Sequence, residues 1–144
     1  MARPSTPAER FGQHLVLKRE PDHADAYALL RNASVRVQPL MRARGWHVPI
    51  LQEMFPRAAN LLGLNYNRGA KILLRLRHPH DKRQFLPLDD VVGTLLHELT
   101  HIVHGPHAAP FYALLDELRR EYDALLVKPR WEADGFVGAG QRLG

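Results

Sequence analysis

The stretch from residue 89 to residue 107 reads DDVVGTLLHELTHIVHGPH, and it decides both the expected fold and the expected chemistry. Its apolar side chains recur every three to four residues, which is typical of one buried face of a helix. These apolar residues are Val92, Leu95, Leu96, Leu99 and Val103. We expect this helix to begin near Asp89 and to end at Gly105-Pro106, because glycine permits a left-handed cap and proline disfavours helix just before itself.

The helix carries an H-E-x-x-H pattern, His97-Glu98-Leu99-Thr100-His101. Residues four apart are neighbours on a helix, and both histidines fall off the apolar face, so their imidazoles can bind one metal ion. Glu98 lies beside them and can hold a water molecule at the metal. Zinc lowers the pKa of such a water toward about 7, so that a carboxylate can take its proton.

The third ligand is predicted to be His107. His104 lies seven residues after His97, about 10 Å further along a regular helix, which is too far for both to bind one ion. His107 follows the break at Gly105-Pro106, where a chain reversal can bring it back over the metal. The ten-residue span from His97 to His107 matches the metzincin spacing, although the glycine is displaced and no methionine follows Met54 to make a Met-turn.

Three further residues of the following helix are candidates for this site. Glu117 or Glu121 is an alternative third ligand, although such acids more often form a solvated face. Tyr112 is a candidate for stabilising a transition-state oxyanion, with a packing or surface role as the alternative. Three neutral histidines would leave zinc its double positive charge and an open position, which suits peptide hydrolysis. We therefore predict that His97, His101 and His107 bind the metal and that Glu98 is the catalytic residue.

The expected fold is α+β, with a small, mostly antiparallel sheet packed on helices and a zincin-type active-site helix. The predicted elements are a helix over residues 22–44, a strand over 46–51, a hairpin of 61–65 and 71–77 around Asn67-Arg68-Gly69, a loop over 78–83 and a helix from about Pro110. Residues 1–20 are expected to be an irregular N-terminal lead-in, residues 21–127 the domain proper, and residues 128–144 an extended C-terminal segment of the same domain. The strand 71–77 is a candidate sheet edge to which an extended substrate can add.

The composition and charge of the chain exclude some classes of protein and favour others. The chain has 144 residues, no cysteine and a net charge of +5, and no apolar run approaches the length of a membrane span. We therefore expect an intracellular protein with no membrane contact and no disulfide or thiolate site. The positive charge is compatible with a nucleic-acid partner. The candidate contacts are Arg75, Arg77, Lys82 and Arg83, for which a basic solvated face is the alternative.

Residues 97–107, followed by 111–118, resemble the WLM-domain metalloproteases. The segments 61–65, 67–69 and 72–77 and the ending 135–144 share this resemblance, which covers about residues 15–144. The H-E-L-T-H-x-x-x-G-P-H core is much more specific than H-E-x-x-H alone.

The resemblance implies a WLM-type zinc protease related to the Spartan proteases and associated with the repair of DNA–protein crosslinks in the nucleus. Such enzymes cleave proteins trapped on DNA, use DNA, especially single-stranded DNA, as activator, and often cleave themselves. The family's metal ligands fall on His97, His101 and His107, and its catalytic glutamate on Glu98. SUMO and segregase contacts are implied only if a C-terminal tail exists beyond this chain. The alternatives are a DNA-binding or scaffold module with a structural zinc, and a peptidase independent of nucleic acid.

Overall fold

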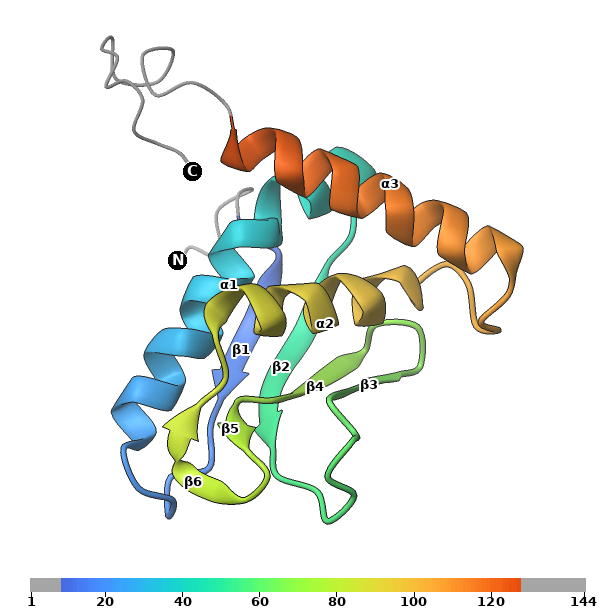
Figure 1. The fold of residues 1–144 in the computed structure, drawn as a ribbon. Coiled ribbons are helices and arrows are strands. Elements are labelled where there is room, and N and C mark those ends of the chain that lie inside the picture. The colour runs from blue at the N-terminus through green and yellow to red at the C-terminus, as the bar shows by residue number, and fades with distance from the viewer. Residues whose placement is uncertain (1–8, 128–144) are drawn as a thin grey trace, which may run out of the picture.

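The helices and strands lie within residues 9–127, the part of the chain that the computed structural model describes (Figure 1). In chain order they are β1 (Phe11–Leu15), α1 (His23–Arg44), β2 (Val48–Met54), β3 (Gly63–Tyr66), β4 (Lys71–Arg75), β5 (Arg77–His78), β6 (Asp81–Phe85), α2 (Leu88–Thr100) and α3 (Ala109–Leu126). The predicted C-terminal segment 128–144 lies outside the described residues.

A four-stranded sheet in the order β1-β2-β4-β3 forms one layer of the molecule. Helix α1 connects β1 to β2, and this crossover places the two strands parallel. Strand β4 lies between β2 and β3, parallel to β2 and antiparallel to β3. The predicted turn joins β3 to β4, with positive φ angles at Asn67, Arg68 and Gly69 (48°, 54° and 100°). Strand β3 is therefore an edge of the sheet, and β4 is an interior strand.

The predicted α+β class, with a small sheet and a helix that carries the H-E-x-x-H pattern, is confirmed. The expectation of a mostly antiparallel sheet is wrong, because β1-β2 and β2-β4 pair in parallel. The difference arises from residues 11–15, which form β1 instead of an irregular lead-in. Strand β1 is stabilised by its pairing with β2. Its sequence is short and mixes polar with apolar residues, so the sequence alone does not predict a strand there.

The segment 78–83, expected to be a loop, contributes to a second, two-stranded antiparallel sheet. In this sheet β5 pairs with β6. Both strands of this sheet are short and mostly polar, so their sequence resembles that of a loop. The predicted edge 71–77 is also corrected, since it divides into the interior strand β4 and the first strand of this second sheet.

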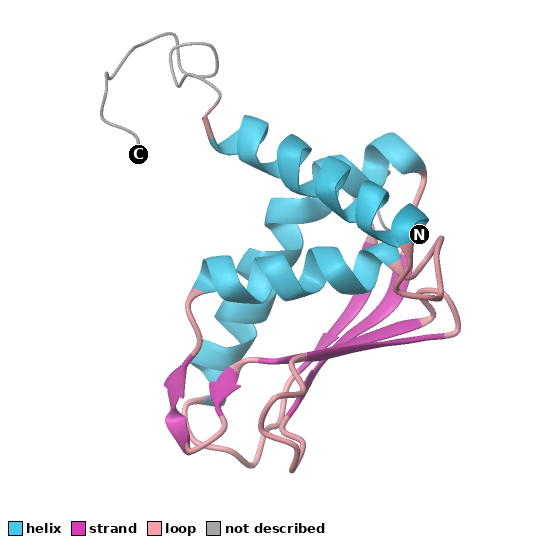
Figure 2. Ribbon diagram, turned by 45° about the vertical axis from the view of Figure 1, so that its right-hand side comes forward, coloured by secondary structure: helices cyan, strands magenta, loops and turns pink. Residues whose placement is uncertain are grey.

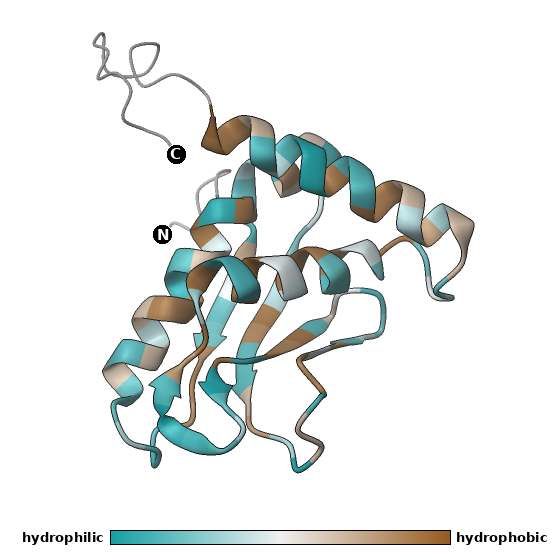
Figure 3. Cartoon of the chain, in the orientation of Figure 1, coloured by the Kyte–Doolittle hydropathy of each residue, from teal (hydrophilic) through white to brown (hydrophobic). Residues whose placement is uncertain are grey.

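Helices α1 and α2 cover one side of the sheet, and α3 lies over them (Figures 1 and 2). Hydrophobic residues recur in bands along these helices and include the buried ones, whereas the β5–β6 hairpin is strongly hydrophilic (Figure 3). Helix α1 runs through Pro39 without dividing and ends at Gly45, whose φ of 72° gives a left-handed cap. Between residues 9 and 127, no helix has both the length and the apolar character that a membrane crossing requires.

Candidate metal centre

Helix α2 presents the H-E-x-x-H residues and ends earlier than the sequence predicts. Its last residue is Thr100, and the chain then turns through residues 101–103, so Val103 is 42% exposed instead of buried. The turn is stabilised where the amides of Ile102 and His104 donate to the carbonyls of Leu99 and Thr100, at 3.0 Å each. This early end starts the reversal that brings the following segment back toward the helix.

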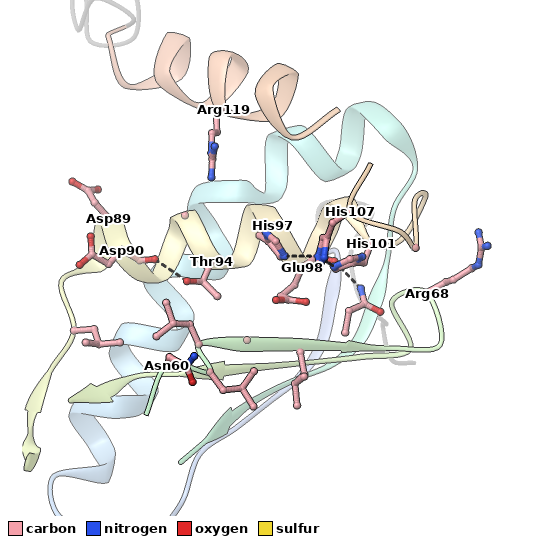
Figure 4. A pocket seen from close by; sticks show the side chains of 18 of the residues that line it. Asn60, Arg68, Asp89, Asp90, Thr94, His97, Glu98, His101, His107 and Arg119 are labelled. Carbon is pink, nitrogen blue, oxygen red and sulfur yellow. Dashed lines mark hydrogen bonds between the residues drawn. The ribbon is translucent and has the colours of Figure 1, made fainter. Parts of the chain in front are cut away.

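Three imidazoles meet at that reversal: His97 and His101 from α2, and His107 from the segment before α3 (Figure 4). Nε2 of His107 lies 3.2 Å from Nε2 of His97 and 3.1 Å from Nε2 of His101. A tetrahedral ion with metal–nitrogen bonds of about 2.0–2.1 Å would hold its ligand nitrogens about 3.3–3.4 Å apart. The three histidines can therefore hold a metal ion.

The imidazoles are oriented by their surroundings. Nδ1 of His101 lies 3.0 Å from the carbonyl oxygen of His104, so it donates there and leaves Nε2 unprotonated toward the cluster. The ring of Phe111, which is buried, packs against His97, His101 and His107 with centroids 4.9, 4.7 and 4.9 Å apart. Burial, followed by the neighbouring histidines and Arg119, lowers the pKa of His97 and so favours the neutral ring that a metal needs.

Glu98 is buried beside the cluster and points toward the sheet (Figure 4). Its side chain is 5% exposed, and no residue between 9 and 127 donates a hydrogen bond to its carboxylate. Burial raises the pKa of Glu98 to about 7. A carboxyl group with this pKa can both accept and release a proton near neutral pH.

The cluster opens into a cleft of about 1120 Å³ between α2 and the edge strand β3. Asp89 and Asp90 lie at one end of this cleft, Arg68 lies at the other, and Arg119 points toward it from α3 (Figure 4). Within residues 9–127, the outer edge of β3 that borders this cleft pairs with no other strand, so an extended chain can add to it.

The alternative ligands of α3 do not reach the cluster. Glu117 and Glu121 both accept hydrogen bonds from Arg44 of α1, at 2.8 Å and 2.6 Å, and this pairing lowers the pKa of Glu121. Their carboxylates therefore connect two helices. Tyr112 is half exposed, and its ring centroid lies 6.4 Å from that of His107, at the side of the metal centre.

Two of the four predicted nucleic-acid contacts are corrected. Arg75 and Arg77 are 1% and 0% exposed, so they cannot reach a phosphate. Arg75 donates to three backbone carbonyls of the segment that joins β2 to β3, and Arg77 pairs with Glu53 at 2.6 Å. Lys82 and Arg83 are exposed, and Lys82 pairs with Glu20 at 2.9 Å.

Three residues that shape the site receive no individual role there from the sequence analysis. Phe111 supports the imidazoles, and Gly63 and Asn65 bring β3 against Glu98. Phe111 is four residues after His107, which is a helical spacing, but from the sequence it is included only in the segment 111–118 of the family resemblance. Gly63 and Asn65 lie in the segment 61–65 that shares the family resemblance, but the sequence does not show their role, because it depends on which helix lies beside the strand.

Comparison with known proteins places these observations in a family. The sequence profile of the WLM domain matches residues 9–144. The chain is 45% identical over 130 residues to the DNA-dependent metalloprotease WSS1 of Saccharomyces cerevisiae, which covers 90% of this chain and 47% of that protein. It is 33% identical over 137 residues to a WSS1 homolog of Schizosaccharomyces pombe, covering 95% of this chain and 48% of that protein. The chain thus spans about half the length of these curated relatives.

Solved structures agree with the sequence comparison. The crystal structure of Wss1 from S. cerevisiae superposes with a TM-score of 0.79 at 39% identity, covering 90% of this chain and 96% of that chain. Wss1 from S. pombe gives a TM-score of 0.72 at 37% identity, covering 84% of this chain and 98% of that chain. The resemblance noted from the H-E-L-T-H core is confirmed along nearly the whole chain, which belongs to the WLM domain family.

Proposed function

We propose that this chain is a zinc-dependent endopeptidase that is activated by DNA, single-stranded DNA above all, and cleaves proteins bound or crosslinked to it. One observation carries the proposal: three imidazole nitrogens converge beside a buried carboxylate that has no hydrogen-bond donor within the described residues. Curated relatives named DNA-dependent metalloproteases support both the proteolytic chemistry and the DNA dependence.

The metal is proposed to be zinc, held by Nε2 of His97, His101 and His107. Three neutral nitrogen ligands at tetrahedral spacing are typical of a catalytic zinc site. Bound zinc would supply a Lewis acid that polarises the scissile carbonyl and lowers the pKa of a water molecule. A structural zinc would instead be closed by a fourth protein ligand, whereas here the cluster faces an open cleft.

Glu98 is proposed to move the protons of the reaction. Its carboxylate accepts a proton from the attacking water and then delivers it to the nitrogen of the leaving amine. The absence of a protein hydrogen bond, in residues 9–127, leaves both carboxylate oxygens available for this exchange. Tyr112, beside His107, is proposed to donate its hydroxyl to the oxyanion that develops on the substrate.

The substrate is proposed to add to β3 as a further strand. The amide of Arg75 donates to the carbonyl of Leu62, and hydrogen-bonded pairs alternate along an antiparallel ladder. In the observed register, the backbone groups of Gly63 and Asn65 then point away from β4, toward the cleft. They can hold an extended polypeptide through its main chain, so we expect cleavage, including self-cleavage, to depend little on the side chains of the substrate.

The DNA contacts are proposed to include Lys82 and Arg83, the two exposed members of the predicted set. A net charge of +5 favours association with a polyanion. From the chain's membership of the WLM domain family, we propose a nuclear role in the repair of DNA–protein crosslinks. SUMO and segregase contacts would require sequence beyond residue 144.

The decisive experiment combines Glu98→Gln with an assay of a DNA-binding protein substrate. We expect the variant to keep one zinc per chain, measured by mass spectrometry of the metal, while cleavage falls about 10²–10⁴-fold. Wild-type cleavage should require single-stranded DNA and weaken as salt rises, because phosphate contacts release counterions. Unchanged cleavage by Glu98→Gln would reject the mechanism, and a rate indifferent to both DNA and salt would reject the activator.

A further inference from the structure

We propose that Asn65 is a positioning residue that holds the edge strand β3 against α2 and so sets where the substrate lies relative to Glu98. The inference rests on the proposed function, because it concerns the strand to which the substrate would add. Asn65 does not touch the reacting atoms; it acts through the backbone of β3 and the backbone of α2.

The Asn65 side chain joins three parts of the site. Its amide nitrogen donates to the backbone carbonyl of Glu98 at 2.7 Å, and its carbonyl oxygen accepts from the amide of Gly69 at 2.9 Å. The first hydrogen bond attaches β3 to the residue that carries the catalytic carboxylate. The second attaches the same side chain to the β3–β4 turn. One amide therefore fixes the strand, its turn and the helix relative to one another.

Close packing supports the same arrangement at Gly63, the first residue of β3, and at Gly69, in the β3–β4 turn. A Cβ at Gly63 would lie 2.8 Å from Oε2 of Glu98 and 2.7 Å from Cγ2 of Thr94. A Cβ at Gly69 would lie 2.9 Å from Cγ1 of Ile102, just after the end of α2. The strand thus approaches the helix as closely as a residue without a side chain allows, and Asn65 makes its hydrogen bond between these two contacts.

This contact has a direct consequence for catalysis. A substrate paired with β3 moves with β3, whereas the imidazoles and Glu98 move with α2 and the segment that follows it. The distance between the scissile carbonyl and the Glu98 carboxylate therefore depends on the bond from Asn65 to the Glu98 carbonyl. A displacement of about 1 Å at a reacting centre can lower the rate about 10²-fold.

Two substitutions separate the two hydrogen bonds of Asn65. Asn65→Ala removes both, whereas Asn65→Asp keeps an acceptor for the Gly69 amide and removes the donor to Glu98. Asn32→Ala, on the exposed side of α1, is the matched control. The measurements are kcat and KM for a peptide substrate with single-stranded DNA present, zinc content, the visible spectrum of the cobalt-substituted protein, and amide hydrogen exchange at Gly69.

We expect kcat per bound metal to fall about 10²-fold in Asn65→Ala and in Asn65→Asp, with KM within about twofold of wild type. The cobalt spectrum should stay unchanged in both, since the imidazoles are not altered. The Gly69 amide also donates to the carbonyl of Tyr66, at 3.2 Å, so exchange there should become only a few-fold faster, and in Asn65→Ala only. The uncharged alanine variant shows that the loss of kcat does not come from the aspartate charge.

Wild-type kcat in Asn65→Ala, or a loss matched by lower metal content or an altered cobalt spectrum, would overturn the inference. Unchanged exchange at Gly69 in Asn65→Ala would also overturn it, and this measurement does not depend on activity. Failure of the proposed function looks different, because a zinc-loaded wild-type chain would then cleave no peptide at all, even with single-stranded DNA present.

Discussion

Glu98 and Glu53 are both buried glutamates, but the protein surrounds them in opposite ways. Glu53 on β2 accepts hydrogen bonds from Nε of Arg77 at 2.6 Å and from the amide of Leu17 at 3.0 Å. Glu98 on α2 receives no hydrogen bond on its carboxylate from residues 9–127, and burial raises its pKa to about 7. One carboxylate is fully paired inside the protein, and the other is left unpaired at the edge of a cleft.

The difference separates a structural carboxylate from a reactive one. A buried ion pair is destabilising to break, because the remaining charge has no partner. A buried carboxylate without a partner is itself destabilising, and such groups are found where the free oxygens are needed for function. The same substitution, glutamate to glutamine, should therefore have opposite effects on stability at the two positions.

The largest effect on stability is expected from Glu53→Gln. The substitution leaves the guanidinium of Arg77 buried without a counterion, with only its hydrogen bonds to the carbonyls of Pro21 and Lys82, so the free energy of unfolding should fall by about 3–5 kcal/mol. Urea denaturation followed by circular dichroism measures this change. Glu20→Gln is the control, since it breaks only the exposed pair with Lys82, for which about 0–1 kcal/mol is expected. Equal losses in the two variants would contradict the distinction between the pairs.

Glu98→Gln in metal-free protein should do the reverse. The folded-state pKa of Glu98, about 7, lies above its value of 4.5 in the unfolded chain, so folding favours the protonated carboxyl. The wild type therefore keeps this contribution fully below pH 4.5 and loses it as pH rises through 7. Relative to wild type, we expect Glu98→Gln to gain about 3 kcal/mol at pH 8 and almost nothing below pH 4.

Denaturation of both proteins at several pH values, with a chelator present, measures this difference. Comparing the two proteins at each pH cancels the titration of the remaining groups. A difference that stays constant with pH would show that Glu98 titrates as an ordinary glutamate, and the contrast with Glu53 would then lose its electrostatic basis.

Arg75→Lys tests the buried cations in the same way, with a smaller effect. Arg75 donates to the carbonyls of Leu61, Pro56 and Ala58 at 3.1, 2.9 and 3.0 Å, and one ammonium group cannot reach all three. We expect the free energy of unfolding to fall by about 1–3 kcal/mol. Arg83→Lys on the exposed hairpin strand should change it by less than about 0.5 kcal/mol. Equal stabilities of the two variants would show that these carbonyl contacts contribute little.

The contrast between these positions also explains what the sequence predicts and what it cannot. The metal cluster follows from local geometry, since a four-residue helical spacing and a chain break decide where His97, His101 and His107 lie. Arg75 and Arg77 alternate with apolar residues and so resemble one solvated face of a strand. The chain instead passes from one sheet to the next between them, and Glu53, which pairs with Arg77, lies 24 positions away. Burial of this kind depends on contacts distant in the sequence.

The smallest expected effect concerns the exposed cations. If Arg83 contacts a phosphate, Arg83→Ala should reduce the slope of log affinity for single-stranded DNA against log salt by about 0.7, the single-strand value for one contact. Lys82→Ala should also reduce the slope, but by less, because Lys82 is partly neutralised by its pairing with Glu20. Arg75→Lys should leave the slope unchanged, because Arg75 is 1% exposed.

Fluorescence anisotropy with a labelled oligonucleotide, between low and physiological salt, gives these slopes. A normal slope in Arg83→Ala and Lys82→Ala would move the DNA contacts away from the β5–β6 hairpin, and a changed slope in Arg75→Lys would mean that the buried arginine acts on the surface through the segment it holds.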